Sequence, residues 1–277
     1  MAGSNLKEDL PFRHYTLKHR LIAWISTHMF DNATYRVRHG LLKGMKRKGG
    51  LGWIPRITSP GVLTAEERFW SDLDLGGLTV YDVGAFQGLV TLFFASQAKA
   101  VVCFEPNTQN HQRLMENLAL NGIKNVEVRK VGVGSRRETR RMAESPLMPG
   151  GSSMDGNVVE SLLRDRGTVV EEISVVALDE EIPRAGLPAP NFIKIDTEGW
   201  EIEALRGARR TLELHKPELF LEMHGETISE KKRKVAEIVA FLWELNYRRI
   251  RHIETGTTII PENAAAAMQG HLYCQPS

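Results

Sequence analysis

The sequence predicts a doubly wound α/β fold in which a mainly parallel sheet follows an N-terminal helical extension. Three observations support this prediction. Apolar segments typical of buried strands alternate with segments of helical periodicity. A glycine-containing turn joins the first of these strands directly to a helix, and an acidic residue ends the second. Such an alternation favours right-handed crossovers and therefore a parallel sheet.

Residues 1–60 form a basic zone rich in aromatic residues, which we treat as an extension separate from the main domain. Apolar residues spaced by three or four positions predict an amphipathic helix over residues 11–30, and glycines at 49, 50 and 52 end the pattern. Such an extension can pack on the main domain, line a substrate pocket, contact a second copy of the chain or lie on anionic lipid. The pattern does not choose among these, so a homo-oligomer contact and a peripheral membrane contact stay open.

The main domain is predicted to span residues 61–277. Its first helix begins at a capping-box pattern formed by Thr64 and Glu67. Strands and helices then follow in alternation as far as residue 131. The predicted strands are 78–83, 100–104 and 126–131, and the predicted helices are 89–98 and 108–121.

Residues 136–172 interrupt this alternation with charged residues, methionines and glycines of little periodicity. Long connections in compact domains are often lids or binding loops, so we predict a lid or substrate loop, with a plain irregular connection as the alternative. The alternation then resumes. Strands are predicted at 173–178, 191–196, 218–224 and 247–253, helices at 200–213 and 229–245, and a helical fragment at 264–267.

The turn after the first strand has the form expected of a nucleoside-binding loop. Asp82 lies near the end of the strand, Gly84 permits a tight turn, and Gly88 lets the next helix start close to the sheet. A helix N-terminus also offers N–H groups to a carboxylate or a phosphate. The pattern disagrees with the dinucleotide-binding fingerprint, because Phe86 and Leu89 stand where its second and third glycines are required.

Glu105 ends the second strand, where an acidic side chain can accept hydrogen bonds from both hydroxyls of a ribose. An acidic strand end is a weak signal by itself, since a surface carboxylate looks the same in sequence. Together with the glycine loop, it favours a small ligand that has one ribose and a carboxylate.

Three segments of the chain together resemble the FkbM-type family of S-adenosylmethionine-dependent methyltransferases: Val80–Ala85, Phe104–Asn107 and Ile193–Glu201. The resemblance covers about residues 62–255, and its most specific part is the Lys-Ile-Asp-x-Glu-Gly-x-Glu run of the third segment. It implies a seven-stranded, Rossmann-like methyltransferase sheet with S-adenosylmethionine as the methyl donor. It also implies O-methylation of a hydroxyl on a saccharide, glycolipid or natural-product small molecule.

The same resemblance implies roles for residues at the strand ends. Asp82, Gly84 and Gly88 are expected to contact the methionine portion of the cofactor, with Glu105 at its ribose and Val133 at its adenine. The full set expected to bind the cofactor is Asp82, Gly84, Ala85, Phe86, Gly88, Glu105, Asn107 and Val133. Phe86 departs from the broader methyltransferase pattern, which often has a glycine at that position.

Methyl transfer is a displacement at an activated sulfonium, so the protein mainly aligns the acceptor oxygen and removes its proton. Asp196 and His224 end two strands predicted to be neighbours and are the candidate catalytic residues. A histidine has a reference pKa of ~6.5, which suits a general base at neutral pH, and a structural role for His224 is the alternative. Asp196 is next in line to take the proton or to orient the acceptor. Lys194 lies on the same strand face and can pair with it.

A divalent cation is a second cofactor that these strand ends can hold. Asp196, Glu222 and His224 would form an oxygen-rich site, without any metal motif of fixed spacing. Glu198 and Glu201 lie at a predicted helix start, where negative charge is favourable, so we expect them to cap that helix.

Charge and hydropathy limit the classes of partner. A net charge of +2 gives no strong field for nucleic acid, so we expect no nucleic-acid partner and a small-molecule or glycan acceptor. No stretch approaches the roughly 18–20 apolar residues of a transmembrane helix and no secretory leader is visible, which predicts a cytoplasmic enzyme.

Two other functions stay open. One is N-methylation of a peptide or other amine, which the missing Asn/Asp-Pro-Pro-aromatic motif disfavours, and the other is a non-catalytic nucleoside-binding module.

Overall fold

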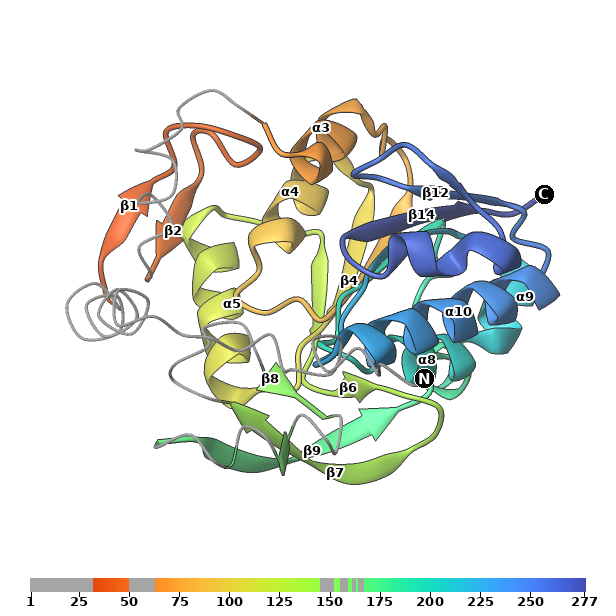
Figure 1. The fold of residues 1–277 in the computed structure, drawn as a ribbon. Coiled ribbons are helices and arrows are strands. Elements are labelled where there is room, and N and C mark those ends of the chain that lie inside the picture. The colour runs from red at the N-terminus through yellow and green to blue at the C-terminus, as the bar shows by residue number, and fades with distance from the viewer. Residues whose placement is uncertain (1–31, 50–62, 145–151, 155–158, 161–162, 164–166) are drawn as a thin grey trace.

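An eight-stranded mixed sheet lies at the centre of the computed structural model, which describes residues 32–49, 63–144, 152–154, 159–160, 163 and 167–277 (Figure 1). The helix predicted over residues 11–30 lies outside these residues. The strands follow the order β13-β12-β14-β11-β10-β3-β4-β5. In chain order they are β3 (Thr79–Val83), β4 (Ala100–Phe104), β5 (Val126–Arg129), β10 (Phe192–Ile195), β11 (Glu218–Glu222), β12 (Arg249–His252), β13 (Thr258–Ile259) and β14 (His271–Gln275).

The five strands from β11 to β5 run parallel, as the alternation of strands and helices predicted. β14 is antiparallel to both of its neighbours, β11 and β12, and β13 adds a short antiparallel strand at the edge. The main sheet therefore has eight strands rather than the seven that the family resemblance implied. The fold class itself, a doubly wound α/β methyltransferase fold, is confirmed.

Helices cover both faces of the main sheet and give the protein three layers. One face carries α3 (Ala65–Asp72), α4 (Leu89–Gln97) and α5 (Thr108–Leu120). The other carries α7 (Leu178–Ala185), α8 (Glu201–Arg206), α9 (Arg209–His215) and α10 (Ile228–Glu244). The predicted capping box is present at the start of α3, where Thr64 and Glu67 exchange hydrogen bonds between side chain and backbone. Because helices bury both faces, the central strands carry apolar residues on both sides.

A second, four-stranded sheet lies below the main sheet in Figure 1 and has the order β6-β9-β7-β8. Its strands are β6 (Gly132–Val133), β7 (Glu138–Glu144), β8 (Ser152–Ser153) and β9 (Val169–Val176). The strand predicted at 173–178 belongs to this sheet and not to the main series. The strand predicted at 126–131 is divided, because β5 ends at Arg129 and β6 begins at Gly132 in the other sheet. Much of the described part of residues 136–172 is therefore strand.

The described part of the N-terminal extension is a β-hairpin rather than a helix. β1 (Thr34–Arg36) pairs antiparallel with β2 (Lys46–Lys48), and β2 lies beside α5 (Figure 1). Two asparagines fix β2 there: the Oδ1 of Asn121, the C-cap of α5, accepts from Lys46 N at 2.8 Å, and the Oδ1 of Asn117 within α5 accepts from Lys48 N at 2.8 Å. These bonds satisfy backbone N–H groups at the edge of the hairpin. The hairpin was not predicted, because its partners lie in α5 and periodicity within the segment does not show them.

The predicted fragment at 264–267 is the end of a 3-10 helix, η1 (Pro261–Ala267). Within the described parts of the chain, none of the helices combines the length and apolar character needed to cross a bilayer.

Candidate functional site

A pocket opens at the carboxyl ends of the parallel strands, the edge where open α/β sheets bind ligands. Its walls come from the turns after β3, β4 and β10 and from the small sheet. Among the residues predicted from the sequence, Gly84, Phe86, Glu105, Val133 and Asp196 line it. Segments distant in sequence thus meet around one cavity.

Gly84 lets the loop after β3 come close to the end of β10. Its φ is 82°, and a Cβ built on it would lie 1.7 Å from the carbonyl oxygen of Asp196. Gly88 is the N-cap of α4 with φ 83°, and a Cβ there would lie 2.3 Å from Leu114 Cδ1. Any side chain at either position would force backbone or core groups apart.

Asp82 lies beneath this loop instead of lining the pocket. Its carboxyl group is fully buried, accepts a hydrogen bond from Thr91 Oγ1 at 2.6 Å, and lies 3.4 Å from Lys194 Nζ. Burial raises the pKa of Asp82, while Lys194 and Thr91 act in the opposite direction. In this structure Asp82 therefore supports the loop from below.

Glu105 lines the pocket and is held by the backbone. Its Oε2 accepts from Phe86 N at 2.8 Å and its Oε1 accepts from Asn107 N at 2.9 Å. Phe86 makes its bond from a left-handed conformation with φ 50°. Because each carboxylate oxygen has two lone pairs, Glu105 can still accept from ligand hydroxyls. Burial raises the pKa of Glu105 to about 8.

Asn107 and Ala85 do not line the pocket. The Asn107 side chain caps α5, where Oδ1 accepts from Asn110 N at 2.9 Å, and its Nδ2 donates to Glu144 Oε2 at 2.9 Å. The Ala85 N–H donates to the carbonyl oxygen of Phe104 at 3.1 Å. Both residues hold the strand ends in place around the pocket.

The pocket also contains residues that sequence reasoning missed. Asn110 of α5 lines it, and Met142 of β7 and Met154, which follows β8, contribute apolar wall. The two methionines stand in the segment 136–172, whose interruption of the strand–helix alternation was the sequence signal for a substrate loop.

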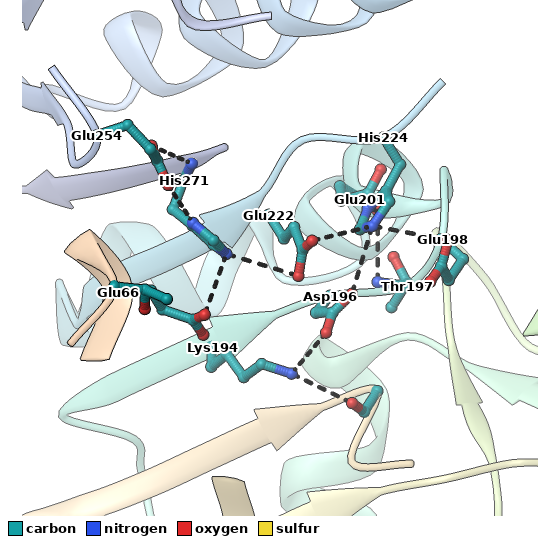
Figure 2. Close-up of polar contacts among 12 residues, drawn as sticks. Glu66, Lys194, Asp196, Thr197, Glu198, Glu201, Glu222, His224, Glu254 and His271 are labelled. Carbon is teal, nitrogen blue, oxygen red and sulfur yellow. Dashed lines mark hydrogen bonds and ion pairs between the residues drawn. The ribbon is translucent and has the colours of Figure 1, made fainter. Parts of the chain in front are cut away.

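Five side chains form a cluster at the other end of the pocket, which we call the His224 cluster: Asp196, Glu198, Glu201, Glu222 and His224 (Figure 2). His224 Nδ1 lies 3.0 Å from Glu201 Oε1. Its Nε2 lies 3.5 Å from Glu222 Oε1, 3.6 Å from Glu198 Oε2 and 3.8 Å from Asp196 Oδ1. The imidazole is therefore surrounded by carboxylates.

These contacts change the chemistry expected of His224. Burial alone would lower its pKa, but its interactions with Glu201 and Glu222 outweigh burial and raise the pKa well above the usual value. The surrounding carboxylates therefore favour the protonated form of the ring in the absence of ligands. An imidazolium has no lone pair to accept another proton, so the argument from a pKa near ~6.5 does not hold here.

Glu198 and Glu201 differ in their surroundings, although the sequence assigned both to helix capping. Glu201 is almost fully buried; burial would raise its pKa, but His224 and the N–H of Gly199 at 2.9 Å lower it. Glu198 lines the pocket with φ 52°, and burial raises its pKa to about 7. Its position two residues after Asp196, beyond the strand end, was the available signal for a pocket residue.

Lys194 connects the His224 cluster to the glycine loop. Its ammonium group donates to Asp196 Oδ2 at 3.0 Å (Figure 2). It also donates to the carbonyl oxygen of Gly84 at 3.2 Å. Burial would lower the pKa of Lys194, but Asp196 and Asp82 raise it. The predicted pairing of Lys194 with Asp196 is present in the structure.

A cation could be held by a different set of side chains from the one predicted. Ligand atoms of Asp196, Glu198 and His224 lie within 4.8 Å of one another, so Glu198 joins this group in place of Glu222. Glu222 turns its second oxygen, Oε2, away toward His271, 3.6 Å from Nε2.

Comparison with known proteins gives consistent results. The profile of the Methyltransferase FkbM domain matches residues 82–249, more than half of the chain. The chain is 30% identical over 154 residues to Methyltransferase sdnD of Sordaria araneosa, covering 46% of this chain and 59% of that protein. It is 27% identical over 137 residues to Hexuronic acid methyltransferase AglP of Haloferax volcanii, covering 48% and 51%. The chain thus spans 51–59% of the length of these relatives.

Among solved structures, methyltransferase FkbM from Methylobacillus flagellatus KT aligns with 22% identity and a TM-score of 0.47, covering 72% of this chain and 43% of that one. The domain match includes the glycine loop, Glu105 and the whole His224 cluster. On the extent of that match, the chain belongs to the FkbM methyltransferase family.

Proposed function

We propose that the protein is an S-adenosylmethionine-dependent O-methyltransferase that acts on a hydroxyl of a saccharide, glycolipid or natural-product small molecule. One observation carries the proposal: a single pocket runs from Glu105 and Val133 to Asp196 and Glu198. A ribose-binding carboxylate at one end and proton-accepting groups at the other are what methyl transfer to oxygen requires.

The residues present fit the cofactor. The close approach of the loop at Gly84 to the end of β10 leaves no room for a side chain there, and Glu105 faces the cavity with lone pairs to spare. Gly84 and Phe86 would border the methionine portion, Glu105 would hold the ribose, and Val133 with Met142 would contact the adenine. S-adenosylmethionine supplies a methyl group bound to a positively charged sulfur.

For proton removal, we assign the carboxylates that line the pocket. Asp196 is our first choice and Glu198 our second, because both face the cavity and both lie within 4 Å of His224 Nε2. Where no cation is bound, the protonated His224 ring would orient them and donate a hydrogen bond to the acceptor. Lys194 would hold Asp196 in place through its 3.0 Å bond.

A divalent cation is a further part of the proposal, because Asp196, Glu198 and His224 offer two oxygen ligands and one nitrogen ligand. Such a donor set suits Mg²⁺ or Mn²⁺, and its binding would displace the proton of His224. The cation and the protonated ring are therefore alternatives at this position, which the chelator test below separates. The cation would attract the acceptor hydroxyl and favour loss of its proton.

The names of the relatives support the proposed acceptor class. One of them is named a hexuronic acid methyltransferase, which supports a saccharide as the acceptor. N-methylation of a peptide or other amine is the competing enzyme activity. Contact of residues 1–60 with a second copy of the chain or with anionic lipid stays a prediction, as does a role of residues 136–172 in holding the acceptor.

The test is a screen of hydroxylated and amine acceptors with a labelled methyl donor, run with and without a chelator. We expect label on a saccharide or natural-product oxygen, and loss of turnover with the chelator that added Mg²⁺ restores. Label transfer to amines alone would overturn the O-methyltransferase assignment. Turnover that a chelator leaves unchanged would remove the cation from the proposal.

Variants assign the residue roles. Gly84→Ala should abolish S-adenosylmethionine binding in calorimetry, because its Cβ would strike the Asp196 carbonyl.

Asp196→Asn should lower kcat by about 10²–10⁴-fold, the usual contribution of a proton acceptor, with cofactor affinity retained. Asp72→Asn is the matched control for Asp196→Asn, since Asp72 is exposed at the C-terminal end of α3. Unchanged turnover in Asp196→Asn would transfer the role to Glu198.

A further inference from the structure

His271 contacts the His224 cluster from outside the segment that matches the family. It is the first residue of β14, and the register of the antiparallel pair places it directly opposite Glu222 of β11. The family match ends at residue 249, so the match assigns nothing to His271.

Three contacts fix the His271 ring on its outer side. Its Nδ1 lies 2.6 Å from Glu254 Oε1, and its backbone N–H donates to Glu254 Oε2 at 2.9 Å. The ring stacks on Phe220, with centroids 5.0 Å apart and planes at 28°. The side chain is only 11% exposed. The ring therefore has one orientation available to it.

That orientation directs the other nitrogen toward the site. His271 Nε2 lies 3.6 Å from Glu222 Oε2 and 4.0 Å from Glu66 Oε2 (Figure 2). The other oxygen of Glu222, Oε1, lies 3.5 Å from His224 Nε2. Glu222 is thus placed between two imidazole rings, one on each carboxylate oxygen.

We infer that His271 is a positioning residue that acts through Glu222: it holds Oε2 so that Oε1 stays against His224. The Glu222 side chain is 37% exposed, so packing alone leaves its carboxylate free to rotate. The nearby carboxylates, Glu66 of α3 and Glu254 after β12, contact the ring from other elements and keep it in this place. The inference rests on the proposed function of the His224 cluster.

The test uses two substitutions of His271 in the full chain. His271→Phe keeps an aromatic ring on Phe220 but removes both nitrogen donors, whereas His271→Gln keeps one N–H donor on a side chain of similar length. We expect kcat to fall about tenfold in His271→Phe, as is usual when a residue that orients an active-site group is removed, with the Kd of S-adenosylmethionine unchanged. His271→Gln should recover part of kcat.

A double-mutant cycle separates positioning from a general loss of packing. If His271 acts through Glu222, His271→Phe should have no further effect on kcat in a Glu222→Gln background. Additive effects would mean that His271 contributes to structure by a route that bypasses Glu222, and would overturn the inference. So would a kcat equal to that of the unaltered enzyme in His271→Phe.

A measurement without turnover keeps the inference distinct from the proposed function. In protein labelled with ¹⁵N-histidine, the ring resonances of His224, assigned with His224→Gln, should move in His271→Phe and in Glu222→Gln. If no acceptor is methylated, these resonances still decide the question. If they stay in place in folded His271→Phe, or in His271→Gln should the first variant not fold, the inference is wrong.

Discussion

Glu105 is almost fully buried at the pocket, with its two oxygens bonded to the N–H groups of Phe86 and Asn107. Because burial raises its pKa to about 8, the side chain is mostly neutral at pH 7. Ribose hydroxyls bond more strongly to an ionised carboxylate than to a neutral carboxyl group. Binding of a nucleoside at Glu105 therefore favours release of its proton.

This predicts a pH-dependent cofactor affinity. With a pKa of about 8, roughly a tenth of Glu105 is ionised at pH 7 and most of it at pH 9. The affinity for S-adenosylmethionine should therefore rise about tenfold over that range, measured by calorimetry. Glu105→Gln is the control: it should bind more weakly, and any remaining pH dependence would come from the amino group of the ligand. Identical pH profiles for the two proteins would contradict the prediction.

Part of the pocket lining could be predicted from short sequence patterns. Gly84 and Glu105 have roles that follow from a strand end and a turn, so sequence was sufficient to place them at the pocket. The protonation of His224 and the pocket position of Glu198 depend on Glu201, Glu222 and a left-handed backbone. Those are properties of the folded chain, because residues from different strands create them.

At the scale of elements, Glu181 of α7 connects the two sheets. Its carboxylate is fully buried and accepts from Arg129 of β5, Arg137 of the turn after β6, and Arg184 of its own helix. Burial would raise the pKa of Glu181, but these arginines lower it to about 2. The folded-state pKa is thus below the unfolded one, so this group stabilises the fold above about pH 4.5 and loses its contribution as the pH falls toward 2.

We therefore expect Glu181→Gln to lower the free energy of unfolding by about 2 kcal/mol at pH 7, within the range for hydrogen bonds to charged groups. Urea unfolding at a series of pH values measures this difference, which should shrink between pH 4.5 and pH 2. Glu180→Gln is the matched control, since Glu180 is largely exposed and 3.9 Å from Arg137. If the difference in free energy of unfolding between the variant and the unaltered protein stays constant from pH 4.5 to pH 2, the charge of Glu181 does not cause it.

Helices and strands were predicted well where periodicity and caps within the segment itself determine them. The strands and helices between Thr64 and Leu120 follow from periodicity and caps. The hairpin at 34–48 and the assignment of β9 to the small sheet did not follow, because both depend on partners elsewhere in the chain. A strand sequence shows that a segment pairs, but it does not show with which sheet.

For the whole molecule, β14 is the element that completes the main sheet. It lies between β11 and β12 and pairs with both. Leu272 is fully buried in this strand and opposite both Leu221 and His252. Since β14 is flanked on both sides, its backbone has no exposed edge on which a missing N–H would be tolerated.

Leu272→Pro should therefore prevent folding of the whole domain, because proline removes a donor and resists the strand geometry at the middle of a ladder. Leu272→Ile, which conserves volume, should cost less than about 1.5 kcal/mol. Thermal unfolding followed by circular dichroism tests both. A cooperative transition near that of the unaltered protein in Leu272→Pro would show that the parallel strands fold without β14.

The position of β14 also has a consequence for synthesis on the ribosome. β11 and β12 emerge first, and each has an edge that residues 271–275 cover in the folded protein. Until those residues leave the exit tunnel, the nascent chain presents open strand edges of the kind that pair with other chains. Aggregation during translation should therefore be greatest when the ribosome stalls late, shortly before β14 is released.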